Sequence, residues 1–150
     1  MRLWMASRIG LTGWLAAETA AKAEKLTFNI ISFQARNADH QPKAGSFEEQ
    51  LLKDLEAQTR AGGSDVIHRI DRATNQMHYL RAIRLTEDCM TCHGKPGSRY
   101  DVNRNGKDVL GFAMEGWEPG GTHGAYEVIL PLAAADAQVT AFIARGAMWL

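Results

Sequence analysis

The sequence predicts an α+β protein with an antiparallel sheet. Apolar residues recur at helical spacing near both ends of the chain, and alternating apolar and polar residues fill much of the middle. A short segment with both cysteines separates two groups of predicted strands. The chain has 150 residues, 45% of them hydrophobic, which is enough for one domain with its own core. We therefore expect a single domain over 1–150.

The first predicted element is a long helix. Its apolar positions have helical spacing, with charged residues between them: Trp14, Leu15, Ala21, Leu26, Ile30 and Phe33. Residues 1–23 superficially resemble a signal peptide, but Arg8 and Glu18 interrupt the apolar run. We therefore assign 1–35 to an N-terminal helical segment. The polar stretch 36–45 then predicts a loop.

A second helix is predicted to start after Ser46 and to end near 61–63. Ser46 precedes Glu49 by three residues, which is the spacing of a capping box. Alternation over 66–70 and 77–84 predicts two strands joined by a turn at 71–75. The apolar runs 109–114 and 125–132 predict a second hairpin with a long glycine-rich loop. We assign 46–132 to the core of the domain.

The last predicted element is a helix over 133–150. Asp136, Gln138 and Arg145 interrupt its apolar character, and it is shorter than the roughly 20 apolar residues of a membrane span. It ends on the cluster 147–150, Ala-Met-Trp-Leu, which is typical of a helix near a membrane interface. We expect it to lead toward a membrane span in a longer chain; the alternative is a free helix that packs on the core.

Charge and cysteine content exclude other classes. The chain has 17 basic and 17 acidic residues and a formal net charge of zero, so no positive field favours nucleic acid as a partner. Two cysteines cannot brace a disulfide-rich fold, so their role is local chemistry.

Both cysteines lie in the segment Cys89-Met90-Thr91-Cys92-His93, which has the C-x-x-C-H pattern of c-type haem attachment. Thiols three residues apart lie about one helical turn from each other, so each can form a thioether to one vinyl group of the same porphyrin. His93 can then bind the iron as proximal ligand. We therefore expect one covalent haem c per chain, held by a short helix, and a periplasmic or extracellular location, because this attachment takes place outside the cytoplasm.

Three other interpretations of the motif stay open. A disulfide between Cys89 and Cys92 would be small and strained, and a thioredoxin-like redox pair needs a parallel β-α-β context that the pattern lacks. A structural zinc site needs four ligands, and only three potential ligands cluster here.

The second axial ligand of such a haem is a separate question. The sequence leaves several candidates open: Met5, on the N-terminal helix, and Met77, Met114, Met148, His40, His68, His78 and His123. Arg81 and Arg84 are candidates to pair with haem propionates, since guanidinium matches carboxylate in a fork. Candidate walls for the porphyrin are Tyr79, Tyr100, Phe112 and Trp117.

Four segments together resemble a known family, the Tll-type haem-c sensor domain found in the periplasmic part of bacterial methyl-accepting chemotaxis proteins and sensor histidine kinases. They are 36–38 (Arg-Asn-Ala), 45–51 (Gly-Ser-Phe-Glu-Glu-Gln-Leu), 82–96 around the motif, and 124–132 (Gly-Ala-Tyr-Glu-Val-Ile-Leu-Pro-Leu). The resemblance covers roughly 27–132. Ala38 departs from the proline that is usual in this family.

The resemblance implies a PAS-like fold with long N-terminal helices over an antiparallel sheet, and one haem bound by Cys89, Cys92 and His93. It implies a homodimer that can exchange N-terminal helices, with a distal ligand from that helix at the position of Met5. It also implies neighbouring transmembrane and cytoplasmic signalling regions. We therefore expect a sensor of redox state or of a small ligand such as NO or CO. The alternative is a monohaem electron carrier; no spacing of a nucleophile and a base predicts an enzyme.

Overall fold

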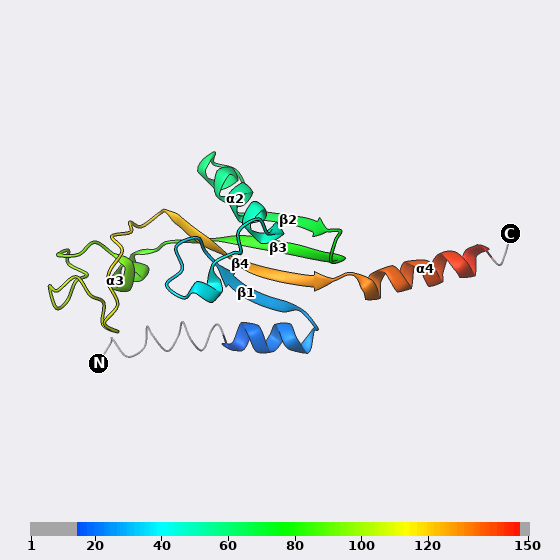
Figure 1. Ribbon diagram of the computed structural model, residues 1–150, viewed down its shortest axis with the longest axis horizontal. Coiled ribbons are helices and arrows are strands. Elements are labelled where there is room, and N and C mark those ends of the chain that lie inside the picture. The colour runs from blue at the N-terminus through cyan, green and yellow to red at the C-terminus, as the bar shows by residue number, and fades with distance from the viewer. Residues whose placement is uncertain (1–14, 148–150) are drawn as a thin grey trace.

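The computed structural model describes residues 15–147, with side chains placed for residues 15–145. In these residues four strands form one antiparallel sheet in the order β1-β4-β3-β2 (Figure 1). The strands are β1 (Thr27–Ile31), β2 (Val66–Asp71), β3 (Gln76–Arg84) and β4 (Thr122–Pro131), and the principal helices are α2 (Phe47–Arg60) and α4 (Ala133–Ala147). The predicted α+β class with an antiparallel sheet is confirmed, as are the helix after Ser46 and the hairpin around 71–75.

The core lies between α2 and one face of the sheet. Direct strand partners share a face, and buried positions alternate along β3 at His78, Leu80 and Ala82. From α2, Leu51, Leu52 and Leu55 contact this face, and each is at most 1% exposed. The hydrophobic cluster therefore fixes α2 across β3 and β4, and burial of these leucines is the main apolar stabilisation of the domain.

The start of α2 has the cap that the sequence predicts. The Ser46 hydroxyl accepts a hydrogen bond from the Glu49 backbone N–H at 3.1 Å. The Glu49 carboxylate accepts from the N–H of Gly45 at 2.7 Å, one residue before the position that a capping box specifies.

We expect Ser46→Ala to lower the free energy of unfolding by about 1 kcal/mol, because it leaves a helix N–H without its side-chain acceptor. Urea denaturation followed by circular dichroism measures this. Ser46→Asp is the matched control, since its carboxylate also caps. Equal losses in the two variants would contradict this role for the hydroxyl.

The predicted long first helix is wrong in its second half. Residues 15–23 are helical, but Thr27–Ile31 form strand β1, which pairs with β4. The helix ends at a turn in which Leu26 N–H donates to Ala21 O at 2.8 Å and Lys25 N–H donates to Lys22 O at 3.1 Å. Lys25 takes the left-handed conformation, φ 60°, where glycine is usual. No glycine marks this helix end, and for that reason the spacing alone suggested continuation.

The predicted strand over 109–114 is also wrong. The Asp108 carboxylate accepts from the backbone N–H groups of Leu110 at 2.8 Å and Phe112 at 3.0 Å. These bonds close a tight loop and occupy donors that a strand partner would need. A single bridge, between Lys107 and Ala113, remains, and β4 pairs instead with β1 and β3.

Helix α4 extends from the end of β4, away from the body of the domain (Figure 1). Its first turn is fixed to the hairpin turn, because Asn75 Nδ2 donates to the Asp136 carboxylate at 2.8 Å. None of the helices in the described part of the chain has both the length and the apolar character needed to cross a membrane.

Candidate haem site

The C-x-x-C-H motif lies on a short helical segment, as predicted. A 3-10 turn η2 (Glu87–Cys89) leads directly into helix α3 (Met90–His93), which ends at Gly94. The side chain of Met90 is 1% exposed, so its burial holds this segment against the rest of the domain. Both cysteines are free thiols and half-buried. The alternative in which they form a disulfide therefore has no support in this structure.

His93 is held by a carboxylate. Its Nδ1 lies 2.9 Å from Glu115 Oε2. Burial opposes ionisation of Glu115, but the hydrogen bonds from Arg36 and His93 outweigh it and keep the pKa of this carboxyl below its usual value. A carboxylate at Nδ1 fixes the ring orientation and leaves Nε2 as the nitrogen available to a metal. This pairing is the usual second contact of a histidine that binds a metal.

Arg36 joins the motif to the loop that follows it. Its guanidinium forms an ion pair with Asp108 at 2.7 Å and hydrogen-bonds both oxygens of Glu115. It also donates to the carbonyls of Cys92 at 3.0 Å and Ala113 at 3.1 Å. The Asp108 side chain is fully buried, and Arg36 and two backbone N–H groups compensate that burial and keep its pKa low. Arg36 thus fixes α3 against 108–115.

Three aromatic rings form a stack beside the motif. Trp117 lies 4.4 Å from His93 and 4.1 Å from His123 between ring centroids, with interplanar angles of 10° and 14°. The backbone supports this order, since Trp117 N–H donates to His93 O at 2.8 Å. Burial, and then the proximity of His93, lower the pKa of His123. The stack connects the motif to the first residues of β4.

An open pocket of about 330 Å³ lies beside His93. Its lining includes His40, which ends the 3-10 turn η1 (Ala38–His40), together with Arg36, Trp117 and His123. Two of the candidate axial ligands, His40 and His123, therefore share a pocket with the motif histidine. Of the three motif residues Cys89, Cys92 and His93, only His93 lines this pocket.

The other predicted site residues lie elsewhere. Met5 and Met148 are outside the described residues, so the Met5 prediction stays a prediction. Arg84 binds Asp65 through two hydrogen bonds of 2.8 and 2.5 Å, and Arg81 is exposed on the sheet; neither lines the pocket beside His93. Of the four predicted wall residues, Trp117 alone lines that pocket. Asp108 and Glu115 are functional residues that no sequence pattern predicts, and Arg36 is marked only by the family resemblance.

These features define an α+β domain with a C-x-x-C-H helix, a carboxylate-held histidine and an adjoining pocket. The chain belongs to the Tll0287-like family, whose model matches residues 11–131. Among solved structures it is similar to the cyanobacterial haem protein Tll0287, with a TM-score of 0.58 and 21% sequence identity, over 79% of this chain and 68% of that chain. That likeness establishes the fold. No curated protein matches this sequence.

Proposed function

We propose that this domain is a periplasmic c-type haem sensor. Cys89 and Cys92 hold one haem covalently, and His93 is its proximal ligand. The observation that carries the proposal is the contact of His93 Nδ1 with Glu115, which leaves Nε2 available beside two free thiols. The haem content of the solved relative supports it. A bound haem supplies an iron whose redox state and axial ligands respond to oxidants and to diatomic gases such as NO or CO.

The protein residues hold and orient the group. Glu115 fixes the His93 ring, and Arg36 holds both Glu115 and the carbonyl of Cys92, so Cys92 and His93 keep one arrangement. Met5 is the distal ligand in this proposal, and His40 and His123 are the described alternatives, because they line the pocket. Gain or loss of the bond between the iron and its distal ligand would change the contacts between the motif and the segment that supplies the ligand.

The output of the proposed sensor passes through α4 to transmembrane and cytoplasmic regions of a longer chain. The exposed residues Val139, Phe142 and Ile143 lie three and four positions apart, so they form one apolar face on α4. Such a face suits pairing with a second helix, which supports the homodimer in our proposal. We assign the domain a signalling role rather than an enzymatic one.

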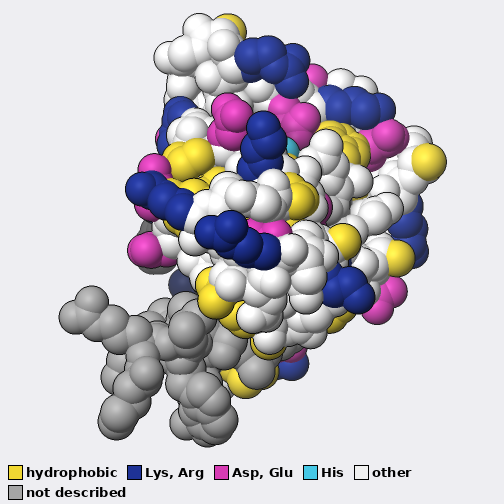
Figure 2. All heavy atoms as spheres, turned by 90° about the vertical axis from the view of Figure 1, so that its left-hand side faces the viewer, with side chains coloured by type: hydrophobic (Ala, Val, Ile, Leu, Met, Phe, Trp, Pro, Cys, Tyr) yellow, Lys and Arg dark blue, Asp and Glu magenta, His cyan; other side chains and the backbone are white. Residues whose placement is uncertain are grey.

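An electron carrier is the main alternative. Carriers of this kind use a docking face of one charge. At the end of the molecule that carries the motif, basic and acidic side chains are interspersed (Figure 2). This distribution favours the sensor.

The test is expression of the full chain in a periplasm with cytochrome c maturation. We expect a covalent haem in the mass spectrum and its complete loss in Cys89→Ser/Cys92→Ser. Absence of haem from the parent protein would refute the proposal. Visible spectra, oxidised and reduced, with and without CO and NO, then distinguish the two functions: a haem that never changes its ligands identifies a carrier.

The distal ligand is tested with Met5→Ala, His40→Ala and His123→Ala. One of these substitutions should shift the spectrum of at least one oxidation state. The control is His68→Ala, because His68 is exposed on β2 and does not line the pocket. Spectra of Met5→Ala identical to those of the parent would exclude Met5.

A further inference from the structure

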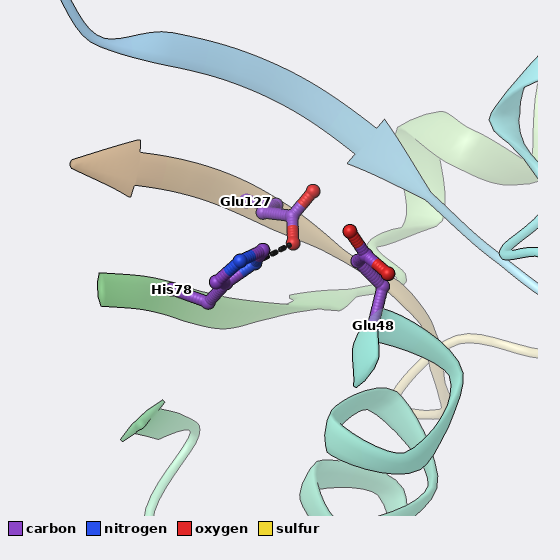
Figure 3. Close-up of side chains that lie close together, drawn as sticks. All are labelled: Glu48, His78 and Glu127. Atoms are coloured by element: carbon purple, nitrogen blue, oxygen red, sulfur yellow. Dashed lines mark hydrogen bonds and ion pairs between the residues drawn. The ribbon is translucent and has the colours of Figure 1, made fainter. Parts of the chain in front are cut away.

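A second group of potential ligands lies away from the motif, on the face of the sheet that α2 covers. Glu48 comes from the first turn of α2, His78 from β3 and Glu127 from β4 (Figure 3). One ligand atom from each residue lies within 4.8 Å of the other two. Three segments far apart in the sequence thus bring one imidazole and two carboxylates to the same point.

Two of these three side chains are buried. His78 and Glu127 are each 1% exposed, and Glu48 is half-buried. His78 Nδ1 lies 2.9 Å from Glu127 Oε1, and Asn29 Nδ2 donates to Glu127 Oε2 at 2.9 Å. A buried carboxylate needs a compensating charge or several hydrogen bonds. The His78 imidazole is the one group with a possible positive charge that contacts Glu127 among the described residues.

Glu48 adds negative charge to this group. Within residues 15–145, its carboxylate forms no ion pair with Lys or Arg and accepts no hydrogen bond, although it reaches the buried pair. Lys43 and Glu48 line the same pocket, but Lys43 forms no ion pair with Glu48 or Glu127. Two carboxylates and a single imidazole keep a net negative charge even when the imidazole is protonated. A divalent cation would neutralise this excess.

The two carboxylates of this group line a pocket that is open to solvent. A pocket of about 290 Å³ is lined by Glu48 and Glu127, together with Asn29, Asp39 and His40. An ion can therefore reach the two carboxylates, and water in the pocket can complete its coordination. The site has no overlap with the cysteines of the motif.

We propose that Glu48, His78 and Glu127 bind a divalent first-row transition-metal cation, with Zn²⁺ bound more tightly than Mn²⁺. Ligand atoms about 2.1 Å from one ion lie about 3.0–3.4 Å apart, slightly more than the present 2.9 Å between His78 Nδ1 and Glu127 Oε1. One nitrogen and two carboxylate groups suit Zn²⁺, Mn²⁺ or Fe²⁺ better than Ca²⁺, which takes oxygen ligands. The ion replaces the proton between His78 Nδ1 and Glu127 Oε1, so Nδ1 binds the ion, the ring keeps a proton on Nε2 only, and any other proton passes to solvent.

The test is titration of Zn²⁺ into the purified full chain in competition with a chromophoric chelator, with Mn²⁺ binding followed by electron paramagnetic resonance. We expect one equivalent to bind, and Glu48→Gln to weaken binding at least about tenfold. Glu48→Gln is the main variant because Glu48 is half-buried, and circular dichroism verifies its fold. The matched control is Glu56→Gln on the same helix, which should bind as the parent does.

The proposal is overturned if the parent chain does not bind the ion, or if the parent and Glu48→Gln bind it with equal affinity. Repeating the titration with Cys89→Ser/Cys92→Ser separates this site from the motif. Retained affinity there, with loss in Glu48→Gln, supports the proposal whether or not the chain carries haem. Loss of the ion in the cysteine variant would place it at the motif instead and overturn the proposal.

Discussion

Gly124→Ala is expected to lower the free energy of unfolding by about 3–4 kcal/mol, the largest effect of any substitution considered. Gly124 lies in β4 with φ 79°, a left-handed conformation that costs about 1–2 kcal/mol for a residue with a Cβ. A Cβ at this position would also lie 2.3 Å from Ile31 O and 2.7 Å from Ser32 Cβ. The first of these atoms is backbone, so β1 must move away from β4 to relieve the contact.

The matched control is Gly120→Ala. Gly120 has a similar φ of 87°, but nothing lies within 4 Å of an added Cβ there. Gly120→Ala should lower the free energy of unfolding by about 1–2 kcal/mol, the conformational cost alone. Urea denaturation of both variants isolates the cost of displacing β1. Equal losses of unfolding free energy in Gly124→Ala and Gly120→Ala would show that the close packing of β1 against Gly124 does not contribute to the cost of the substitution.

The second large effect is expected for Arg36→Met, at about 2–3 kcal/mol of unfolding free energy. This substitution leaves the buried Asp108 carboxylate without its ion-pair partner. Breaking a buried pair costs about 3–5 kcal/mol, and we expect less here because the Arg36 side chain is 27% exposed. Arg69→Met is the control: it removes an exposed pair with Asp54 and should cost under about 1 kcal/mol.

The effect of Arg36→Met should depend on pH. In the parent, contacts with Arg36 help to hold the pKa values of Asp108 and Glu115 below their ordinary 3.8 and 4.5. Groups with a depressed pKa contribute stability above their unfolded pKa and lose it as the pH falls through the folded value. The stability difference between parent and Arg36→Met should therefore be full above about pH 5 and narrow below pH 4. A difference that is constant from pH 7 to pH 3 would contradict the ion-pair account.

Local patterns account for most of what the sequence predicts correctly. The cap at Ser46, the alternation in 66–84 and the spacing of Cys89 and Cys92 depend on neighbours within a few residues, so they are visible without a fold. Strand β1 is not evident from the sequence, because Lys25 rather than a glycine ends the preceding helix and so leaves its boundary unmarked. The strand expected at 109–114 is a loop, because the side chain of Asp108 binds the backbone donors.

The partners of the motif could not be predicted in the same way. Arg36 meets Asp108 and Glu115 across 72 and 79 residues of sequence, and Glu115 lies 22 residues beyond His93. His78 and Glu127 are separated by 49 residues, and β3 and β4 bring them together. Such contacts depend on strand order and register, which alternation alone does not determine.

Strand β4 sets the distance between the motif and helix α4. His123, in the ring stack beside the motif, is near the start of β4, and α4 begins at Ala133. Ten residues of extended chain span about 33 Å, so nothing bound at the motif can contact α4 directly. Asn75, in the turn between β2 and β3, also fixes the first turn of α4. A movement of β4 relative to β3 would therefore tilt α4 about this turn, and the displacement would be largest at the C-terminal end of α4.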